Sequence, residues 1–204
     1  MSSDPKLIPY ILPLVEGAVV LDVGCGRGKW GYLLKVDYWY TKAGRRKNKL
    51  NYLVGTDLHP KYLEFVKYHK VYDDLVLCDA TLLPFRDQVF DTVLFLEVIE
   101  HMVKNEGVKS LEEAERVACC LVLVSTPSFF MKQEAKDANV FQKHLSNWTI
   151  KDFIKQGYSI WFGSFPLERV YSYLQYFFIK LTYFLPQFPV SFIAIKHIST
   201  DRDK

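Results

Sequence analysis

The fold of this 204-residue chain is decided by residues 18–31, AVVLDVGCGRGKWG. An apolar run leads to Asp22, and Gly24, Gly26 and Gly28 follow at alternate positions. This pattern predicts a buried strand that turns sharply into a helix, with glycines where φ is positive and where a ligand approaches bare backbone. Free N–H groups at the start of such a helix favour negatively charged groups. The stretch therefore predicts a site for a nucleotide-like cofactor.

The spacing of the glycines separates this loop from two common phosphate-binding loops. No Gly-Lys-Ser/Thr sequence closes it, so it is not a P-loop. Its G-x-G-x-G pattern also departs from the G-x-G-x-x-G fingerprint of dinucleotide-binding folds. Taken alone, the loop is also compatible with a tight strand–helix turn that binds nothing.

Four later segments extend the pattern along the chain: residues 52–57 (YLVGTD), 75–80 (LVLCDA), 90–101 (FDTVLFLEVIEH) and 121–127 (LVLVSTP). In this order, the segments and the glycine loop resemble the class I S-adenosylmethionine (SAM)-dependent methyltransferases. The resemblance covers roughly residues 15–165. It is closest to the small stand-alone type, which has a Glu-x-x-Glu-His segment after strand four.

The alternation of strands and helices predicts an α/β fold. Continuous apolar runs predict strands at 18–23, 52–57, 74–78, 91–96 and 120–125, buried on both faces; residues 158–163 and 190–198 are expected to be the last two. The resemblance implies a single-domain, Rossmann-like, doubly wound and mostly parallel seven-stranded sheet with an antiparallel last strand and helices on both faces. Residues 5–16 predict a short broken helix, and capping-box patterns place helix starts at Ser110 and Thr149, the latter helix ending at Gly157.

The resemblance also implies which residues bind SAM and its product, S-adenosylhomocysteine. Asp57 is expected to accept hydrogen bonds from the ribose hydroxyls and Asp79 from the adenine amino group, whereas Glu97 and His101 flank the methionine part. Both aspartates are also good cap or turn residues, and Glu100 is equally explained as an acid at a helix start. The full expected cofactor-binding set is Asp22, Gly24, Cys25, Gly26, Gly28, Asp57, Leu58, Asp79, Ala80, Glu97 and His101.

The long loop after the fifth strand, residues 126–148, is expected to lie above the cofactor. Ligands of open α/β sheets bind beyond the C-terminal ends of the strands, and loops of this length are usually functional. His144 is the candidate catalytic residue, because a histidine can accept a proton from the nucleophile. It is equally suited to bonding a backbone carbonyl and holding the loop in place. Trp148 is expected in the core or the pocket wall.

Two segments stand apart from the repeating pattern. Residues 37–50 form an expected insertion, rich in basic and aromatic residues, that suits nucleic acid or lipid headgroups, or is simply a solvated loop. Residues 166–188 form an expected aromatic helical segment. Since 167–185 are apolar on nearly all sides, they predict a lid over an apolar substrate, a homodimer interface or a peripheral membrane contact. A membrane-spanning helix is not expected, because Pro186 and Pro189 break any helix of spanning length.

The bulk composition is that of one globular domain over residues 1–204. Half of the residues are hydrophobic and 24% are charged, and a net charge of +3 is too small to argue for nucleic acid. The four cysteines, none in a C-x-x-C pair, are expected to be reduced in a cytoplasmic protein and not to bind metal. The histidines show no metal-ligand spacing, and no signal peptide is expected.

These features predict a SAM-dependent methyltransferase that moves a methyl group to an O, N or C centre of a small or lipid-like acceptor. The first alternative is an RNA or protein methyltransferase that uses the basic insertion. The second is a SAM-binding module without turnover. The glycine spacing disfavours an NAD-dependent oxidoreductase. The sequence names neither the acceptor nor the general base.

Overall fold

The computed structural model describes residues 5–40, 50–129, 132–135, 139–162, 165–166 and 191–199. The first of these ranges begins with the expected broken helix, made of η1 (Pro5–Leu7), α1 (Ile8–Ile11) and η2 (Leu12–Leu14). Prolines at the starts of α1 and η2 interrupt it, because proline lacks the N–H that continues a helix.

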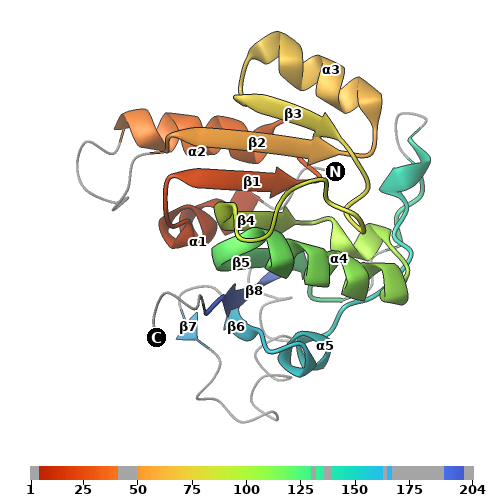
Figure 1. The fold of residues 1–204 in the computed structure, drawn as a ribbon. Helices are drawn as coiled ribbons and strands as arrows, with labels where there is room; N and C mark the ends of the chain where they lie inside the picture. The colour runs from red at the N-terminus through yellow and green to blue at the C-terminus, as the bar shows by residue number, and fades with distance from the viewer. Residues whose placement is uncertain are drawn as a thin grey trace.

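One sheet, in the order β3-β2-β1-β4-β5-β8-β6-β7, organises the described residues (Figure 1). Its strands are β1 (Val19–Val23), β2 (Tyr52–Asp57), β3 (Asp74–Leu77), β4 (Phe90–Leu96), β5 (Ala118–Pro127), β6 (Ser159–Phe162), β7 (Phe165–Pro166) and β8 (Ser191–His197). The first five are parallel. Strand β8 lies antiparallel between β5 and β6. The seven predicted strands and the antiparallel edge are therefore confirmed. The structure adds an eighth strand that was not predicted, the two-residue β7, which pairs with β6.

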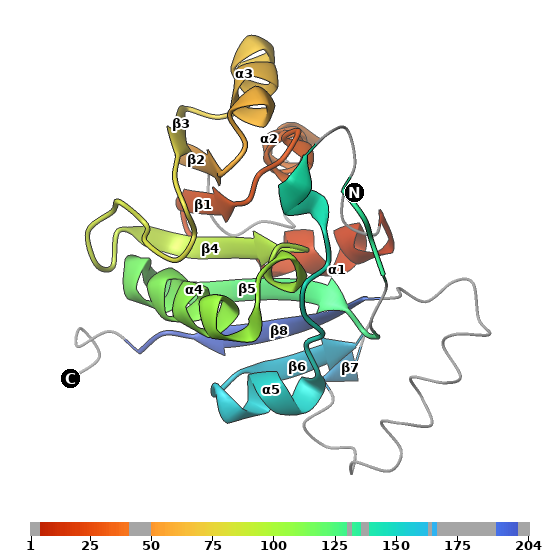
Figure 2. The same cartoon turned by 90° about the vertical axis from the view of Figure 1, so that its right-hand side faces the viewer.

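Helices cover both faces of the sheet, as Figure 2 shows. On one face lie α4 (Lys104–Val117) and α5 (Ile150–Lys155), which pack with Val93, Phe95 and Val122. On the other face α1, α2 (Lys29–Tyr40) and α3 (Pro60–His69) pack with Leu94 and Leu123. Neighbouring residues of one strand point to opposite faces, so strands buried on both sides must be apolar throughout. The doubly wound fold is confirmed.

The predicted start of the helix before β5 is wrong. Helix α4 begins at Lys104, and Ser110 is buried in its middle, where its Oγ donates to the Met102 sulfur over 3.2 Å. Gly107 obscures the longer helix in the sequence, because glycine has a low helix propensity. The structure needs it, since a Cβ at Gly107 would lie 2.4 Å from a ring carbon of Trp148. Tertiary packing outweighs propensity here.

The second predicted helix start is confirmed. Thr149 accepts from the Asp152 N–H, and the Asp152 carboxylate accepts from the Thr149 N–H. Gly157 follows α5 at a left-handed φ of +80°. Trp148 is buried in the core beside α5.

The two segments outside the repeating pattern are described only at their ends. The first four residues of the expected insertion belong to α2, which ends at Tyr40, and residues 41–49 lie outside the described residues. Of the aromatic segment 166–188, all but residue 166 also lies outside them. Among the helices that the structure describes, none is long and apolar enough to cross a membrane.

Candidate functional site

A cavity of about 410 Å³ opens where the parallel strands end. The segments that follow β1, β2, β3 and β4 meet there, which is the position expected for a ligand in an open α/β sheet. Nine of the expected cofactor residues line it: Gly24, Cys25, Gly26, Asp57, Leu58, Asp79, Ala80, Glu97 and His101. Segments distant in the sequence are thus brought to one concave surface.

The glycine loop forms the wall of the cavity after β1. Gly24, Gly26 and Gly28 have φ values of +67°, +53° and +81°, a region that favours glycine. At Gly24 an added Cβ would lie 2.5 Å from a methyl group of Val98. At Gly26 the same atom would meet open space, with only the Gly24 carbonyl oxygen within 4.0 Å. The loop therefore presents bare backbone to the cavity at Gly26.

Asp57, at the end of β2, is fixed against this loop. One carboxylate oxygen accepts from the Gly26 N–H over 2.9 Å, and the other accepts from the His59 N–H over 2.8 Å. Burial raises the pKa of this carboxyl despite these bonds. Because each carboxylate oxygen can accept more than one hydrogen bond, Asp57 retains acceptor capacity for a ligand in the cavity. The bond to the His59 N–H is a turn before α3, whereas the N-cap of that helix is His59, so the alternative of Asp57 as the helix cap is wrong.

Two expected cofactor residues, Asp22 and Gly28, do not line the cavity. Asp22 is only 1% exposed, and its carboxylate accepts a hydrogen bond from the Tyr72 hydroxyl. The same hydroxyl oxygen accepts from the Gly31 N–H, at 3.2 Å. Burial raises the pKa of Asp22 to about 7. Asp22 therefore ties β1 to the start of α2 through Tyr72, and it supports the loop from behind.

Glu97 follows β4 on the cavity floor in a strained conformation. Its φ of +58° lies in the left-handed region, which non-glycine residues rarely adopt. The two carboxylate oxygens accept from the hydroxyls of Ser125, over 2.9 Å, and Ser191, over 3.2 Å. Strained residues held by their surroundings cluster at functional sites. The strands β5 and β8 thus hold an acidic group at the cavity.

His101 lies at the end of η4 (Ile99–His101), and its ring nitrogen Nδ1 is 3.0 Å from the Lys143 carbonyl oxygen. A carbonyl only accepts, so Nδ1 carries the proton and Nε2 is the acceptor. Burial lowers the pKa of His101 to about 4, and the ring is therefore neutral near pH 7. A neutral histidine at the cavity wall offers an acceptor for a ligand hydroxyl or amine proton.

The preceding residue, Glu100, is fully buried. Its carboxyl accepts from the Thr126 hydroxyl over 3.2 Å, while its backbone carbonyl accepts from the N–H groups of Leu145 and Ser146. Burial, with the nearby Glu97 carboxylate, raises the pKa of Glu100 well above its ordinary value. The Glu-x-x-Glu-His segment is thereby joined to the loop after β5.

The proposed catalytic His144 does not line the cavity. Its ring lies edge-on to that of His101, with centroids 4.9 Å apart. The backbone N–H of His144 donates to the Gln133 carbonyl over 3.1 Å. One ligand atom from each of Glu100, His101 and His144 lies within 4.8 Å of the others, so these three residues could hold a metal ion. Sequence spacing gave no sign of this group, because the fold brings it together.

The other expected residues on the cavity wall include Asp79 and Cys25. Asp79 is exposed, and its Oδ1 accepts from the Thr81 N–H over 2.8 Å. The Cys25 N–H donates to the Thr56 carbonyl over 2.8 Å, which closes the loop onto β2. Burial raises the pKa of the Cys25 thiol, so this cysteine is a neutral part of the wall.

Thirteen lining residues were not predicted. They are Val23, Arg27, Lys29, Trp30, Thr56, Tyr62, Cys78, Leu96, Val98, Met102, Asn139, Phe141 and Gln142. Three of them come from the segment around η5 (Val140–Gln142), which lies beyond the ends of β1 and β2 (Figure 1). The position of loop 126–148 above the cavity was predicted in general terms, but no local pattern singled out these side chains.

We compared the chain with protein families and with known proteins. Residues 21–119 match the model of the methyltransferase domain family. Over 114 residues the chain is 29% identical to the probable tRNA methyltransferase 9B of Mus musculus, covering 55% of this chain and 22% of that protein. The chain thus spans about a fifth of the length of this curated relative.

Solved structures share the fold over nearly the whole chain. A SAM-dependent methyltransferase from Archaeoglobus fulgidus has a TM-score of 0.59 at 17% identity, covering 94% of this chain and 91% of that one. A putative Haloferax volcanii methyltransferase, solved with the Trm112 methyltransferase activator, has a TM-score of 0.60 at 17% identity, covering 95% and 86%. Residues 21–119 therefore match a methyltransferase domain, and the chain shares the fold of a SAM-dependent methyltransferase.

Proposed function

We propose that this protein binds SAM in the cavity at the ends of the parallel strands and transfers its methyl group to an acceptor. The observation that carries the proposal is the pairing of Asp57 with the Gly26 N–H at the cavity wall. A fixed carboxylate beside exposed glycine backbone suits a ligand with a sugar diol and a nearby polar chain.

The described residues fit SAM. An added Cβ at Gly26 would project into open space, so the loop leaves room for a ligand against its backbone. In this arrangement Asp57 accepts from the ribose hydroxyls and Asp79 from the adenine amino group. Glu97 and His101 lie at the methionine end, where a carboxylate suits an ammonium group. When bound, SAM supplies a methyl group that its positively charged sulfonium already activates.

The protein's own task is to align the acceptor and to exclude water. The η5 segment contributes Asn139 and Phe141 to the wall, and the Asn139 side chain accepts from the Phe141 N–H over 2.9 Å, which fixes the segment. His101 lines the cavity, and its Nε2 lone pair is our candidate to accept a hydrogen bond from an acceptor hydroxyl or amine. His144 supports the His101 ring and takes part in moving the proton.

The acceptor class stays a proposal. A small or lipid-like acceptor is our first candidate, because the sequence predicts at 167–185 a helix with more apolar faces than a core requires; these residues lie outside the described residues. RNA or protein is the second candidate, and two observations favour RNA. The curated relative named above is a probable tRNA methyltransferase, and Arg27 and Lys29 add basic side chains to the cavity lining.

Calorimetry with SAM, S-adenosylhomocysteine and NAD tests the cofactor. We expect binding of SAM and its product, and tighter binding of NAD would overturn the proposal. SAM labelled in the methyl group, incubated with lipid, small-molecule, RNA and protein fractions of a cell extract, then identifies the acceptor. Label in RNA alone would reject the first candidate. Cofactor binding without transfer to any fraction would favour a SAM-binding module without turnover.

A further inference from the structure

An irregularity between β4 and β5 places two adjacent cysteines opposite one aspartate. Phe90 pairs with Ala118, but the next paired residue, Thr92, lies opposite Leu121. Cys119 and Cys120 therefore share the place opposite Asp91, which is the arrangement of a β-bulge. Adjacent residues of a regular strand point to opposite faces. The bulge instead lets both thiols approach the same carboxylate.

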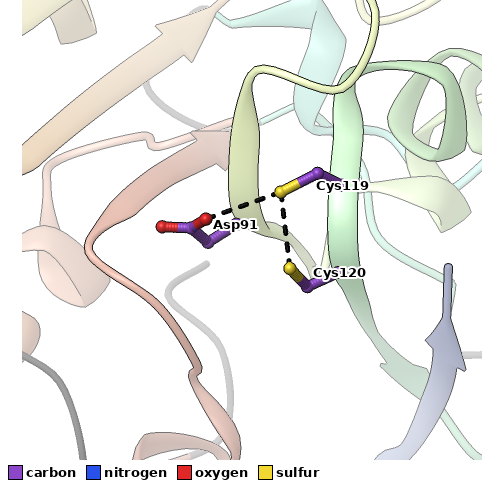
Figure 3. A group of neighbouring side chains, drawn as sticks. All are labelled: Asp91, Cys119 and Cys120. Atoms are coloured by element: carbon purple, nitrogen blue, oxygen red, sulfur yellow. Dashed lines mark hydrogen bonds between the residues drawn. The ribbon is translucent and has the colours of Figure 1, made fainter. Parts of the chain in front are cut away.

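Figure 3 shows the three side chains converging. The two sulfur atoms are 3.4 Å apart, and the Cys119 sulfur is 3.5 Å from Oδ1 of Asp91. One ligand atom from each residue lies within 4.8 Å of the other two. In a tetrahedral zinc site, Zn–S bonds of about 2.3 Å and Zn–O bonds of about 2.0–2.2 Å put neighbouring ligand atoms about 3.5–3.8 Å apart. The two distances above, 3.4 and 3.5 Å, are thus close to those between the ligand atoms of a zinc site.

The Asp91 carboxylate is held in place from behind. Its Oδ2 accepts from the N–H groups of Ala18, over 2.6 Å, and Val19, over 2.8 Å. Gly17 leaves room for this contact, since a Cβ there would lie 2.1 Å from the Asp91 Cβ. Backbone bonds of this kind orient metal-binding carboxylates. Within the described parts of the chain Asp91 forms no salt bridge, so no side-chain cation neutralises its charge.

A disulfide between the two cysteines fits less well. The Cα atoms of adjacent residues are about 3.8 Å apart across a trans peptide, whereas disulfides usually join Cα atoms about 4.4–6.8 Å apart. A metal ion bridges two such sulfurs without drawing them into bonding contact. Thiolate ligands select zinc and other thiophilic ions over magnesium and calcium.

The geometry points to a zinc site formed by Asp91, Cys119 and Cys120. Zinc displaces the two thiol protons into solvent, and water takes the fourth position, because Cys120 is exposed. The site joins β4 to β5 and, through Ala18 and Val19, to the start of β1. It lies where these strands begin, whereas the cofactor cavity lies where they end. The inference is therefore independent of the proposed methyl transfer.

Cobalt is the probe for this site, because tetrahedral cobalt with thiolate ligands has a characteristic charge-transfer absorption. We expect one equivalent of cobalt to saturate this band in the reduced protein, and zinc to abolish it. Cobalt at Glu100, His101 and His144 would give no thiolate band, so the signal distinguishes the two groups. The band is expected to disappear in Cys119→Ser and Cys120→Ser. Affinity is expected to fall at least about tenfold in Asp91→Asn, which loses a charged ligand worth on the order of 1.4 kcal/mol or more.

Cys78→Ser is the matched control, since Cys78 is distant in the fold and its removal leaves the band unchanged. A second measurement is protection from alkylation, followed on the tryptic peptide of residues 117–132, which contains both cysteines. Zinc is expected to protect both thiols in the wild type. The inference is overturned if the folded, reduced wild type gives no thiolate band, or if the band survives in both serine variants.

Discussion

The imidazole rings of His101 and His144 lie edge to face with their centroids 4.9 Å apart, although 42 residues separate them. His101 lines the cavity, whereas His144 stands behind it on the loop after β5. Nearby, the Lys143 carbonyl accepts from the His101 ring, and the N–H groups of Leu145 and Ser146 donate to the Glu100 carbonyl. The pair therefore couples that loop to the cavity.

Replacing His144 with alanine is expected to lower turnover by about 100-fold, the lower range of general acid–base effects, while SAM affinity changes little. The physical reason is that His144 packs against the His101 ring, which lines the cavity. Steady-state kinetics and calorimetry measure the two quantities. His197→Ala is the matched control, because His197 is the exposed last residue of β8. Unchanged kinetics with a lower melting temperature would mean that His144 only holds the loop.

Asp57→Ala is expected to weaken SAM binding by about 1.5–3 kcal/mol, the scale of hydrogen bonds to a charged group. This corresponds to roughly ten- to a hundredfold in Kd. Asp87→Ala serves as the control, because Asp87 is exposed and pairs with Arg116 away from the cavity. Equal affinities for wild type and Asp57→Ala, measured by calorimetry, would remove Asp57 from the site.

Gly26→Val is expected to abolish SAM binding and leave a folded protein, because the valine side chain fills the open space beside the loop. Gly157→Val is the matched control. It introduces the same residue at another left-handed position, φ +80°, that is remote from the cavity. Both variants carry backbone strain, so both lose stability, but only the first loses the ligand. Normal SAM binding by Gly26→Val would place the cofactor elsewhere.

Asp22→Asn tests the buried carboxyl behind the loop. The folded-state pKa of Asp22, about 7, exceeds the ordinary 3.8, so the folded wild type keeps a proton that the unfolded chain releases. Wild-type stability therefore falls as pH rises from about 4 to 7, by about 1.4 kcal/mol per unit of pKa shift. Asparagine does not titrate and can still accept from Tyr72.

Urea unfolding at pH 5 and pH 8 is the measurement for Asp22. We expect the free energy of unfolding of the asparagine variant, relative to that of the wild type, to be higher at pH 8 than at pH 5. Identical pH dependence in the two proteins would contradict the raised pKa. Because Asp22 does not line the cavity, its replacement is also expected to cost less SAM affinity than Asp57→Ala.

The aromatic segment 167–185 stays a prediction, since it lies outside the described residues. Tyr173→Glu combined with Tyr176→Glu is expected to disrupt its contact with a second subunit, an apolar acceptor or a membrane surface, and to leave SAM binding intact. Light scattering, turnover and liposome co-sedimentation distinguish the three. No change in any of them would show that these tyrosines are ordinary surface residues.

Much of the sheet could be predicted from the sequence because its determinants are local. A strand covered on both faces must be apolar along its length, as residues 52–57 and 91–96 are, and Gly24 and Gly26 mark the turn that only glycine adopts without strain. The order of the strands and of the glycine loop along the chain also predicted that Asp57 lies at the cofactor site, and it lines the cavity. The capping box at Ser110 failed because Gly107, unfavourable in a helix, is required by the ring of Trp148.

The sequence by itself determined the order of the strands, the glycine turn and the acidic residues that end β2 and β4. Only the tertiary structure decided which side chains meet. In the fold, Asp22 is buried against Tyr72, and Phe141 lines the cavity. The His144 ring packs against His101, and two adjacent cysteines lie beside Asp91. These contacts join residues far apart in the chain, or depend on a shift in strand register. Local patterns fix the elements, whereas packing and register fix the distances between them.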